Sequence, residues 1–337
     1  MKALVTGATG FIGSHIADRL VERGHSVRAL VRQGSDTAFL EERGVELVRG
    51  DITEPETIPP AMDGVDAVFH AAALVTDWAP WPDFDRVTIG GTAFMLESAA
   101  RAGVSRFLHV STDGVYAHRL LGRRMTEDSP LETRFTWWDY YRRSKLAAEV
   151  LARQYHASGR LAVTVVRPGL VLGERDRVTL PGTIAFLKSA TASYLGSGRN
   201  RLPCVYAGDV AGGCLLAVDS DVAAGEAYNL VAAEKVTQRD LYRVIGEECN
   251  IRLPKRHTPV PLVHALALGF EVASVLRGRR SRPTLSRFAV TMIGRPYIED
   301  PTKADHDFGW RALTSLRESV RRSVAWDREH RRQAVSG

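Results

Sequence analysis

The first half of the chain alternates between short apolar runs and longer stretches in which apolar positions recur every three to four residues. The short runs, rich in β-branched residues, predict strands, and the longer stretches predict helices. The predicted strands are residues 2–6, 26–31, 45–49, 67–70, 106–111 and 162–167, and the predicted helices are 11–23, 91–101 and 140–155. Most of these strands are continuously apolar, which is typical of a parallel sheet covered on both faces. We therefore expect an α/β fold built on a doubly wound parallel sheet.

Beyond residue 170 the pattern is less regular. Residues 183–189 and 238–248 predict helices, and Thr237 is suited to cap the second of them. We expect a cofactor-binding domain that includes residues 1–170 and the returning segment 204–235, a smaller C-terminal substrate lobe of 171–203 and 236–326, and a frayed polar tail of 327–337.

The composition is that of an ordinary globular chain, with 45% apolar and 25% charged residues among 337. It excludes a disordered protein, a collagen-like repeat and a disulfide miniprotein. The cysteines form no CxxC pair or Cys/His cluster, so we expect no structural metal and a reducing, cytoplasmic compartment. No signal peptide and no membrane-spanning stretch is predicted. The net charge of +6 favours anionic ligands or surfaces, but much of it lies in late arginine clusters, and no nucleic-acid partner is expected.

Residues 6–13 read Thr-Gly-Ala-Thr-Gly-Phe-Ile-Gly and lie between the first predicted strand and the first predicted helix. Gly7 permits a tight turn, Gly10 lets backbone amides approach a pyrophosphate, and Gly13 lets the helix lie close to the sheet. This pattern predicts a dinucleotide-binding turn, and the alternative is an ordinary turn. The candidate cofactor-binding residues in it are Gly7, Thr9, Gly10, Phe11, Ile12 and Gly13.

The end of the second strand bears on the choice between NAD and NADP. An NAD site usually has an acidic residue there, whereas this chain has Val31 followed by Arg32. An arginine offers several donors to a 2′-phosphate, so NADP(H) is favoured over NAD(H), unless Arg32 is only a solvated loop residue. After the third strand come Asp51 and Ile52, which are further cofactor candidates. Asp51 is suited either to accept from the adenine amino group or to cap a turn.

Tyr141 and Lys145 form a Tyr-x-x-x-Lys pair on a predicted helix, where the four-residue spacing puts both side chains on one face. A free tyrosine, with a pKa near ~10, is a poor acid or base at neutral pH. We expect the Lys145 ammonium to stabilise the phenolate and lower the pKa of Tyr141. Tyr140 is a competitor with a less favourable offset. The hydroxyls of Ser111 and Thr112, after the fifth strand, are suited to orient a substrate oxygen or to cap the following turn.

Together these residues make the chain resemble the extended short-chain dehydrogenase/reductase superfamily over nearly its whole length. The resemblance also includes the motifs His-Ala-Ala-Ala at 70–73, Arg-Pro-Gly at 167–169 and Tyr-Ala-Gly-Asp-Val-Ala at 206–211. It implies a Rossmann-type domain in which Ala71, Ala72, Ala73 and Pro168 join the cofactor site. It also assigns the active-site hydroxyl to Thr112 rather than Ser111, because a Val-Tyr pair follows three positions later.

One position departs from the family pattern. Thr88 stands where these proteins often have an asparagine in the helix after the fourth strand. Threonine has a shorter reach and fewer donors than asparagine, so the structural role of that position is in doubt here.

The C-terminal third is similar to the 3β-hydroxysteroid dehydrogenase and sterol-4α-carboxylate 3-dehydrogenase group, through the motifs at 282–287, 300–304 and 308–310. Dihydroflavonol reductases and sugar-epimerase-like proteins share parts of this pattern. Four tryptophans are expected either to rim the substrate crevice as apolar walls or to pack loop on loop. They are Trp78, Trp81, Trp137 and Trp138.

The resemblance implies an alcohol dehydrogenase or ketoreductase that acts on a small hydrophobic, sterol-like or triterpenoid-like substrate. Tyr141 is the expected general acid and base, Lys145 tunes it, and Thr112 holds the substrate oxygen. The alternatives are a nucleotide-sugar epimerase or dehydratase of the same fold and a non-catalytic NADP sensor. A homodimer remains open.

Residues 261–276 are apolar almost all round when wound as a helix, apart from a narrow stripe with His264 and Glu271. Four arginines follow at positions 277, 279, 280 and 282. One explanation is a buried core helix. The other is peripheral contact with an anionic membrane through residues 261–282, because an apolar helix beside a basic cluster suits such a surface.

Overall fold

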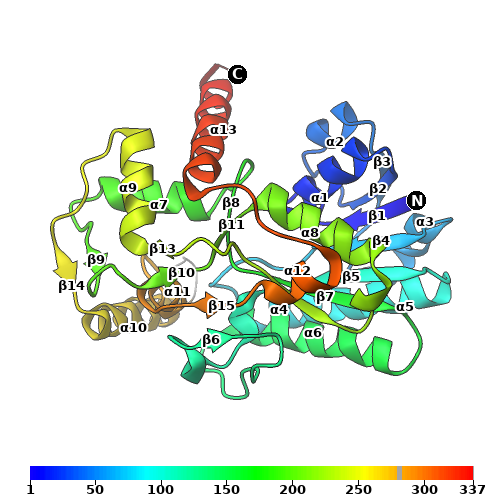
Figure 1. The fold of residues 1–337 in the computed structure, drawn as a ribbon, viewed down its shortest axis with the longest axis horizontal. Helices are drawn as coiled ribbons and strands as arrows, with labels where there is room; N and C mark the ends of the chain where they lie inside the picture. The colour runs from blue at the N-terminus through cyan, green and yellow to red at the C-terminus, as the bar shows by residue number, and fades with distance from the viewer. Residues whose placement is uncertain (279–282, 337) are drawn as a thin grey trace.

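The computed structural model describes residues 1–278 and 283–336. Seven strands of the described residues form a central sheet in the order β12-β7-β5-β4-β1-β2-β3, and every neighbouring pair is parallel (Figure 1). Their bounds are β1 Lys2–Thr6, β2 Ser26–Val31, β3 Glu46–Arg49, β4 Ala67–His70, β5 Arg106–Val110, β7 Val163–Pro168 and β12 Ala227–Leu230. The expected doubly wound α/β fold is confirmed.

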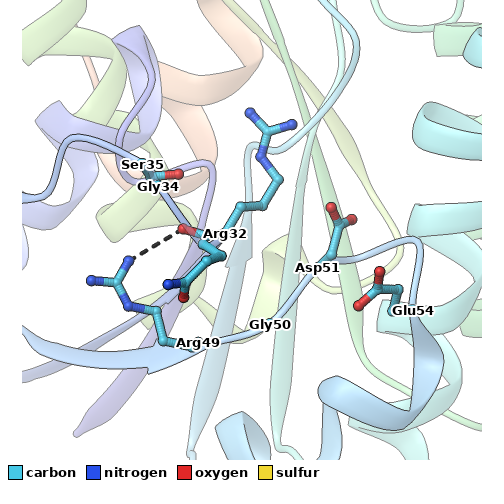
Figure 2. A pocket seen from close by; sticks show the side chains of 8 residues that line it. Arg32, Gly34, Ser35, Arg49, Gly50, Asp51 and Glu54 are labelled. Carbon is cyan, nitrogen blue, oxygen red and sulfur yellow. Dashed lines mark hydrogen bonds between the residues drawn. The ribbon is translucent and has the colours of Figure 1, made fainter.

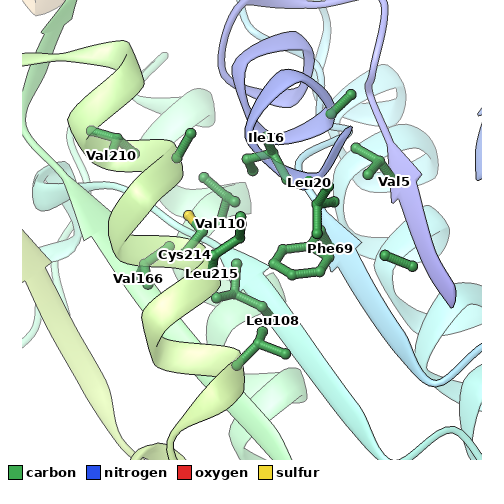
Figure 3. Packing of buried hydrophobic residues seen from close by; sticks show 14 of the residues in the cluster. Val5, Ile16, Leu20, Phe69, Leu108, Val110, Val166, Val210, Cys214 and Leu215 are labelled. Carbon is green, nitrogen blue, oxygen red and sulfur yellow. The ribbon is translucent and has the colours of Figure 1, made fainter. Parts of the chain in front are cut away.

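Helices cover both faces of this sheet. On one face, α1 (Phe11–Glu22) and α8 (Ala207–Asp219) pack together over the strands (Figure 3). On the other face lie α5 (Gly91–Arg101) and α6 (Tyr140–Ala157). Neighbouring residues of a strand pack into the cores on opposite faces of the sheet. Phe69 packs toward α1 and α8, while Val68 packs toward α5. Burial on both faces explains why these strands are continuously apolar.

The second half of the chain adds short two-stranded pairs and a helical lobe at the end of the molecule away from β1–β3 (Figure 1). The strand pairs are β8 (Leu170–Leu172) with β11 (Cys204–Tyr206), β10 (Arg201–Leu202) with β13 (Val236–Thr237), β9 (Tyr194–Leu195) with β14 (His257–Thr258), and β6 (Arg124–Met125) with β15 (Ile298–Glu299). The helices of this lobe are α7 Thr179–Lys188, α9 Gln238–Cys249, α10 Val260–Leu276, α11 Arg287–Gly294 and α13 Leu316–Ser336, whereas α12 Thr302–Phe308 packs against β12 and α8. The predicted Thr237 cap is confirmed, because its hydroxyl accepts from the Asp240 backbone in a capping box.

One prediction about the C-terminus is wrong, and several helices were not predicted. The polar tail is not frayed but continues α13 to Ser336. The Trp326 ring stacks on His330 at 4.1 Å, and Arg328 donates to the Glu248 carbonyl of α9 at 2.6 Å. These contacts extend the helix past Asp327. The short helices α2 (Ala38–Glu42), α3 (Pro59–Met62) and α4 (Trp81–Phe84) and the long α8 are not predicted, since none stood out by its apolar period.

The explanation of α10 as a buried core helix is also wrong. Only Val263, Ala267, Glu271 and Ser274 of this helix are buried. Glu271 pairs with Arg287 of α11 at 2.7 Å, and His264 bonds the Thr291 hydroxyl at 3.0 Å. The polar stripe thus faces α11, while larger apolar side chains face outward: Leu262, Leu266, Leu268, Phe270, Val272 and Leu276. Among the described residues, no helix combines the length and apolar character needed to cross a bilayer.

Candidate active site

The glycine turn joins the end of β1 to the start of α1 and is closely packed. Gly7 has φ +70°, and a Cβ there would lie 2.8 Å from the Ala72 nitrogen. A Cβ on Gly13 would lie 2.2 Å from the Gly7 carbonyl oxygen, so helix and turn meet as expected. Gly10 begins α1 without a side-chain cap, and no acidic residue lies in the first turn. Together with the exposed Thr9, this leaves a helix N-terminus that fits a dinucleotide pyrophosphate.

The alanine segment after β4 lies against this turn. The Ala71 nitrogen donates to the Thr6 carbonyl at 3.2 Å, and the Ala72 nitrogen to the Thr6 hydroxyl at 3.4 Å. The order of the strands reverses between β1 and β4, which is where doubly wound sheets bind ligands. The structure therefore brings Gly7 and the segment from Ala71 to Ala73 together, as the resemblance implies. Phe11 and Ile12 begin α1 beside them.

Two buried side chains, His70 and Thr88, hold the alanine segment in place, and the sequence did not predict this role for His70. His70 bonds Thr6 at 2.8 Å through Nδ1 and Thr92 at 3.0 Å through Nε2. Burial lowers the pKa of His70 to about 3, so the ring is neutral at pH 7. Thr88, whose role was in doubt, accepts from the Leu74 nitrogen at 3.1 Å and holds the end of this segment.

A pocket of about 530 Å³ opens at the ends of β2 and β3 (Figure 2). It is lined by Arg32, Gln33, Gly34, Ser35, Arg49, Gly50, Asp51 and Glu54. Arg49, which sequence reasoning missed, is the last residue of β3 and donates to the Arg32 carbonyl at 3.2 Å. One Asp51 oxygen accepts from the Thr53 nitrogen at 2.8 Å, so this carboxylate shapes a turn while it also lines the pocket. Ile52 is buried beneath it.

Tyr141 and Lys145 lie one turn apart on α6, but their electrostatics differ from the expectation. Lys145 is buried and donates to the Val110 carbonyl at 2.6 Å. Burial lowers the pKa of Lys145 to about 8, against the opposing effect of Glu149. The pKa of Tyr141 is about 12, because burial and the charge of Asp113 raise it and the hydrogen bond with Thr112 lowers it less. The expected lowering of the Tyr141 pKa is therefore wrong, since burial and the charge of Asp113 outweigh the groups that favour the phenolate.

The structure brings Thr112, and not Ser111, to Tyr141. The Ser111 hydroxyl donates to Glu149 at 2.6 Å inside the core. Thr112 lies near enough to Tyr141 to lower the pKa of that phenol. The Thr112 hydroxyl donates to Asp113 at 3.1 Å and accepts from the Gly114 nitrogen at 3.2 Å, which is the capping role considered as an alternative. Tyr140 contacts Trp81 at 5.6 Å instead.

Beneath these residues lies an ion pair that sequence reasoning missed. Glu149 and Arg167 are fully buried and 2.5 Å apart. Arg167 also donates to the Tyr116 hydroxyl at 2.9 Å, so the network ties α6 to β7 and the segment after β5. Pro168, which the resemblance places beside the nicotinamide, follows Arg167 in β7 and is buried. The sequence feature that could have indicated this ion pair is the position of Glu149, one turn beyond Lys145 on the same helix face.

Three of the tryptophans, Trp78, Trp137 and Trp138, pack loop on loop, whereas Trp81 begins α4 and contacts α6. Trp138 lies 3.9 Å from Trp137 in a stacked arrangement and 5.4 Å from Trp78, while Trp81 lies under the Arg143 guanidinium. Trp137 is nevertheless 62% exposed.

Helix α11 covers this side of the site. The Phe288 ring lies 5.7 Å from the Tyr141 ring, and Arg287 donates to the Trp137 carbonyl at 2.9 Å. Tyr141 thus lies between Thr112 and the Phe288 ring.

Comparison with known proteins identifies the family. The model of the NAD dependent epimerase/dehydratase family matches residues 3–230. A 4-hydroxy-2-methyl-3-oxo-4-farnesyl-3,4-dihydroquinoline-1-oxide ketoreductase from Stigmatella aurantiaca is 31% identical over 311 residues, which are 92% of each chain. A 3 beta-hydroxysteroid dehydrogenase/Delta 5→4-isomerase from Mycobacterium tuberculosis is 28% identical over 332 residues, 95% of this chain and 88% of that one. The crystal structure of gox2253 superposes with a TM-score of 0.80 at 29% identity and covers 97% of this chain and 98% of that one.

These matches confirm the resemblance to the extended superfamily and to its steroid-dehydrogenase group. The family match begins in β1 and ends in β12, so it includes the glycine turn, the alanine segment and the Tyr141–Lys145 pair. The chain belongs to the NAD dependent epimerase/dehydratase family of the extended short-chain dehydrogenase/reductase superfamily.

Proposed function

We propose that the protein interconverts a secondary alcohol and a ketone on a hydrophobic, sterol-like or triterpenoid-like substrate, with NADP(H) as cofactor. The observation that carries the proposal is the arrangement after β5, where Tyr141 lies against the Phe288 ring and Lys145, one turn further along α6, donates to the Val110 carbonyl. The glycine turn, the alanine segment, Arg32, Asp51 and Pro168 would hold the cofactor, which supplies or accepts the hydride when bound.

In this proposal the Tyr141 hydroxyl gives its proton to the carbonyl oxygen during reduction and takes it back during oxidation. Thr112 holds that oxygen in place. With a pKa of about 12, Tyr141 keeps its proton at neutral pH, which suits the reducing direction. Lys145, with a pKa of about 8, is mostly charged at pH 7 and favours the phenolate that remains after proton transfer.

Two observations support an apolar substrate. The exposed Trp137 indole and the Phe288 ring give the surroundings of Tyr141 apolar surface. The relatives include a ketoreductase whose name specifies a farnesyl-bearing substrate and a 3 beta-hydroxysteroid dehydrogenase.

The experiment that tests the function follows NADPH absorbance with 5α-cholestan-3-one in detergent micelles and identifies the product by mass spectrometry. We expect one NADPH to be oxidised for each ketone reduced. Conversion of a nucleotide sugar with no net change in cofactor would favour an epimerase instead. Tight NADPH binding without turnover of either substrate would favour a sensor.

Cofactor preference is expected to depend on Arg32. A charge-assisted hydrogen bond contributes roughly 1.5–3 kcal/mol, so Arg32→Ala should weaken NADPH binding by about tenfold or more and leave NADH nearly unchanged. Fluorescence titration with both cofactors measures this, and Arg23→Ala, a surface change on the α1–β2 turn, is the control. Equal weakening of both cofactors, or of neither, would argue against the role of Arg32 in NADP selection.

We further propose that residues 261–282 contact an anionic membrane. The outward side chains of α10 form an apolar surface that includes Leu262, Leu266 and Phe270. The exposed Arg277 follows this surface, and exposed basic residues precede it at Arg252, Lys255 and Arg256. Arg279, Arg280 and Arg282 belong to the same proposal but lie outside the described residues. Because α10 packs on α11, whose Phe288 contacts Tyr141, a lipid substrate would reach the site from this side.

Co-sedimentation with phosphatidylcholine vesicles, with and without phosphatidylserine, tests this contact. We expect binding to the anionic vesicles that weakens as salt is raised, and its loss when Arg277, Arg279, Arg280 and Arg282 are all changed to Gln. Leu266→Ser with Phe270→Ser should also weaken it. Equal partitioning onto neutral and anionic vesicles, or no effect of the arginine changes, would contradict the proposal.

A further inference from the structure

A second group of polar side chains lies beside Thr112 and Tyr141, and the proposed mechanism does not use it. We call Asp113, Tyr297 and Glu299 the acidic cluster. Their relative exposures are 1%, 3% and 9%, so all three are buried. Tyr297 packs with Tyr116 and Met125, and Glu299 lies opposite Met125, which places both beside the segment that begins at Asp113. The charge of Asp113 also raises the pKa values of Tyr141, Tyr297 and Glu299.

Backbone structure fixes this cluster from two directions. Asp113 directly follows Thr112, and its Oδ1 accepts from the Thr112 hydroxyl at 3.1 Å. Glu299 is the last residue of β15, and Tyr297 directly precedes that strand and packs with Met125 of β6. The Tyr297 nitrogen donates to the Arg201 carbonyl at 3.1 Å, and β15 pairs with β6 in a register that opposes Glu299 and Met125. The cluster is thus anchored by main-chain contacts and does not depend on its own side-chain bonds.

Four polar atoms of the cluster have no hydrogen-bond partner within the described parts of the chain. They are Asp113 Oδ2, the Tyr297 hydroxyl, and both carboxylate oxygens of Glu299. Buried polar groups without partners are costly and rare in native proteins. The Arg142 guanidinium does not satisfy them, because it donates to Asp139 at 2.6 Å and to the Tyr116 carbonyl at 2.9 Å.

Burial also raises the pKa values of the two carboxyls, Asp113 and Glu299. Burial raises the pKa of Asp113 to about 6, while burial and the charge of Asp113 raise the pKa of Glu299 well above its ordinary value. Such a pair can accept hydrogen bonds from a neutral hydroxyl or hold an ammonium group. Both are groups that donate hydrogen bonds.

We propose that the acidic cluster is a substrate subsite that binds a hydrogen-bond-donating group, a hydroxyl or an amine, a few bonds from the reacting carbon. This rests on the proposed function for the reaction and adds to it the substrate class. The substrate is amphipathic. Its apolar body lies against the Phe288 ring, and its hydrogen-bond donor lies against the acidic cluster. A simple apolar ketone leaves the four buried atoms unpaired and binds less well.

The test is a binding measurement that requires no turnover. Quenching of tryptophan fluorescence, with Trp137 and Trp138 beside the site, gives dissociation constants for 2-dodecanone, 1-hydroxy-2-dodecanone and 1-dimethylamino-2-dodecanone. We expect the hydroxylated or the amino probe to bind at least about tenfold more tightly than 2-dodecanone. Tightest binding of the hydroxylated probe identifies a neutral donor, and tightest binding of the amino probe identifies a cation. Equal affinity for all three probes would overturn the subsite.

Variants separate a binding role from a structural one. Glu299→Leu, and the more conservative Glu299→Gln and Tyr297→Phe, should each reduce the discrimination between probes. None of them should lower the unfolding temperature by much, because Glu299→Leu and Tyr297→Phe remove unpartnered buried polar groups and Glu299→Gln replaces the carboxyl by an amide of the same shape. Asp128→Asn, a change of an exposed carboxylate after β6, is the matched control and should alter neither.

A fall in unfolding temperature for both Glu299 variants, with discrimination unchanged, would make the cluster structural and overturn the proposal. The two proposals fail separately. If no ketone is reduced with NADPH, the proposed function fails while the probe affinities still report on the subsite. If ketones are reduced but the probes bind equally, only the subsite fails.

Discussion

Replacing Tyr141 by phenylalanine is expected to lower turnover by about 10²–10⁴-fold while NADPH binding changes within a few-fold. The ring retains its edge contact with Phe288 at 5.7 Å, so packing is kept. Only the hydroxyl is lost, and with it the proton donor for the carbonyl oxygen. Steady-state reduction of a ketone, together with a fluorescence titration of NADPH, measures the two effects separately.

Tyr140→Phe is the matched control, because Tyr140 is the neighbouring tyrosine and contacts Trp81 and Phe84 away from Thr112. It should leave turnover nearly unchanged. If Tyr141→Phe kept more than a tenth of the parental activity while Tyr140→Phe did not, the assignment of the proton donor would be wrong.

The fold could be predicted from the sequence because its determinants are local. Strands buried on both faces are apolar along most of their length, so β1, β2 and β4 were predicted at their observed bounds, whereas the edge strand β12 was not predicted. Helix α8 escaped prediction because it is buried in the core against α1 and β5 and therefore shows little polar periodicity.

Part of the candidate site is predictable for the same local reason. The glycine turn and the pair on α6 are close in sequence, so spacing alone brings their members together. The preference for Thr112 over Ser111 came from a resemblance, and the structure supplies its physical reason, since Ser111 donates into the core to Glu149.

Features that depend on tertiary contacts could not be predicted. The apolar pattern of residues 261–276 does not tell which side faces the protein, and only the pairing of Glu271 with Arg287 places the polar stripe inward. The pKa of Tyr141 depends on the depth of burial and on Asp113, neither of which follows from the spacing to Lys145. Arg167 and Glu149 are 18 residues apart in sequence, and the Arg-Pro-Gly motif that contains Arg167 does not indicate Glu149 as its partner.

The buried pair of Glu149 and Arg167 leads to the second large expected effect, a loss of stability in Glu149→Gln of about 3–5 kcal/mol. Both side chains are fully buried, and Arg167 would keep its bonds to the Tyr116 hydroxyl and the Glu127 carbonyl but lose the only negative charge within the pair. Urea unfolding followed by tryptophan fluorescence measures the loss. Glu97→Gln, which breaks the surface pair with Arg160, is the control and should change the midpoint little.

The same substitution should shift the pH dependence of reduction toward lower pH. The charge of Glu149 raises the pKa of Lys145, which burial brings down to about 8. Without that charge the Lys145 pKa falls further, so the ammonium that favours the Tyr141 phenolate is lost at a lower pH. In the parent, activity should be constant below about pH 8 and fall as pH rises through that value, whereas in Glu149→Gln the fall should begin earlier.

A double variant separates the two consequences of removing Glu149. Glu149→Leu with Arg167→Met replaces both charges by apolar side chains and should recover much of the lost stability, because no unpaired charge remains buried. It should not restore the pH profile, since Lys145 still lacks the negative charge near it. Stability and pH dependence that recover together would mean that the pair acts on Lys145 only by holding the fold. A profile that stays shifted in a restabilised protein would establish Glu149 as the residue that keeps Lys145 charged.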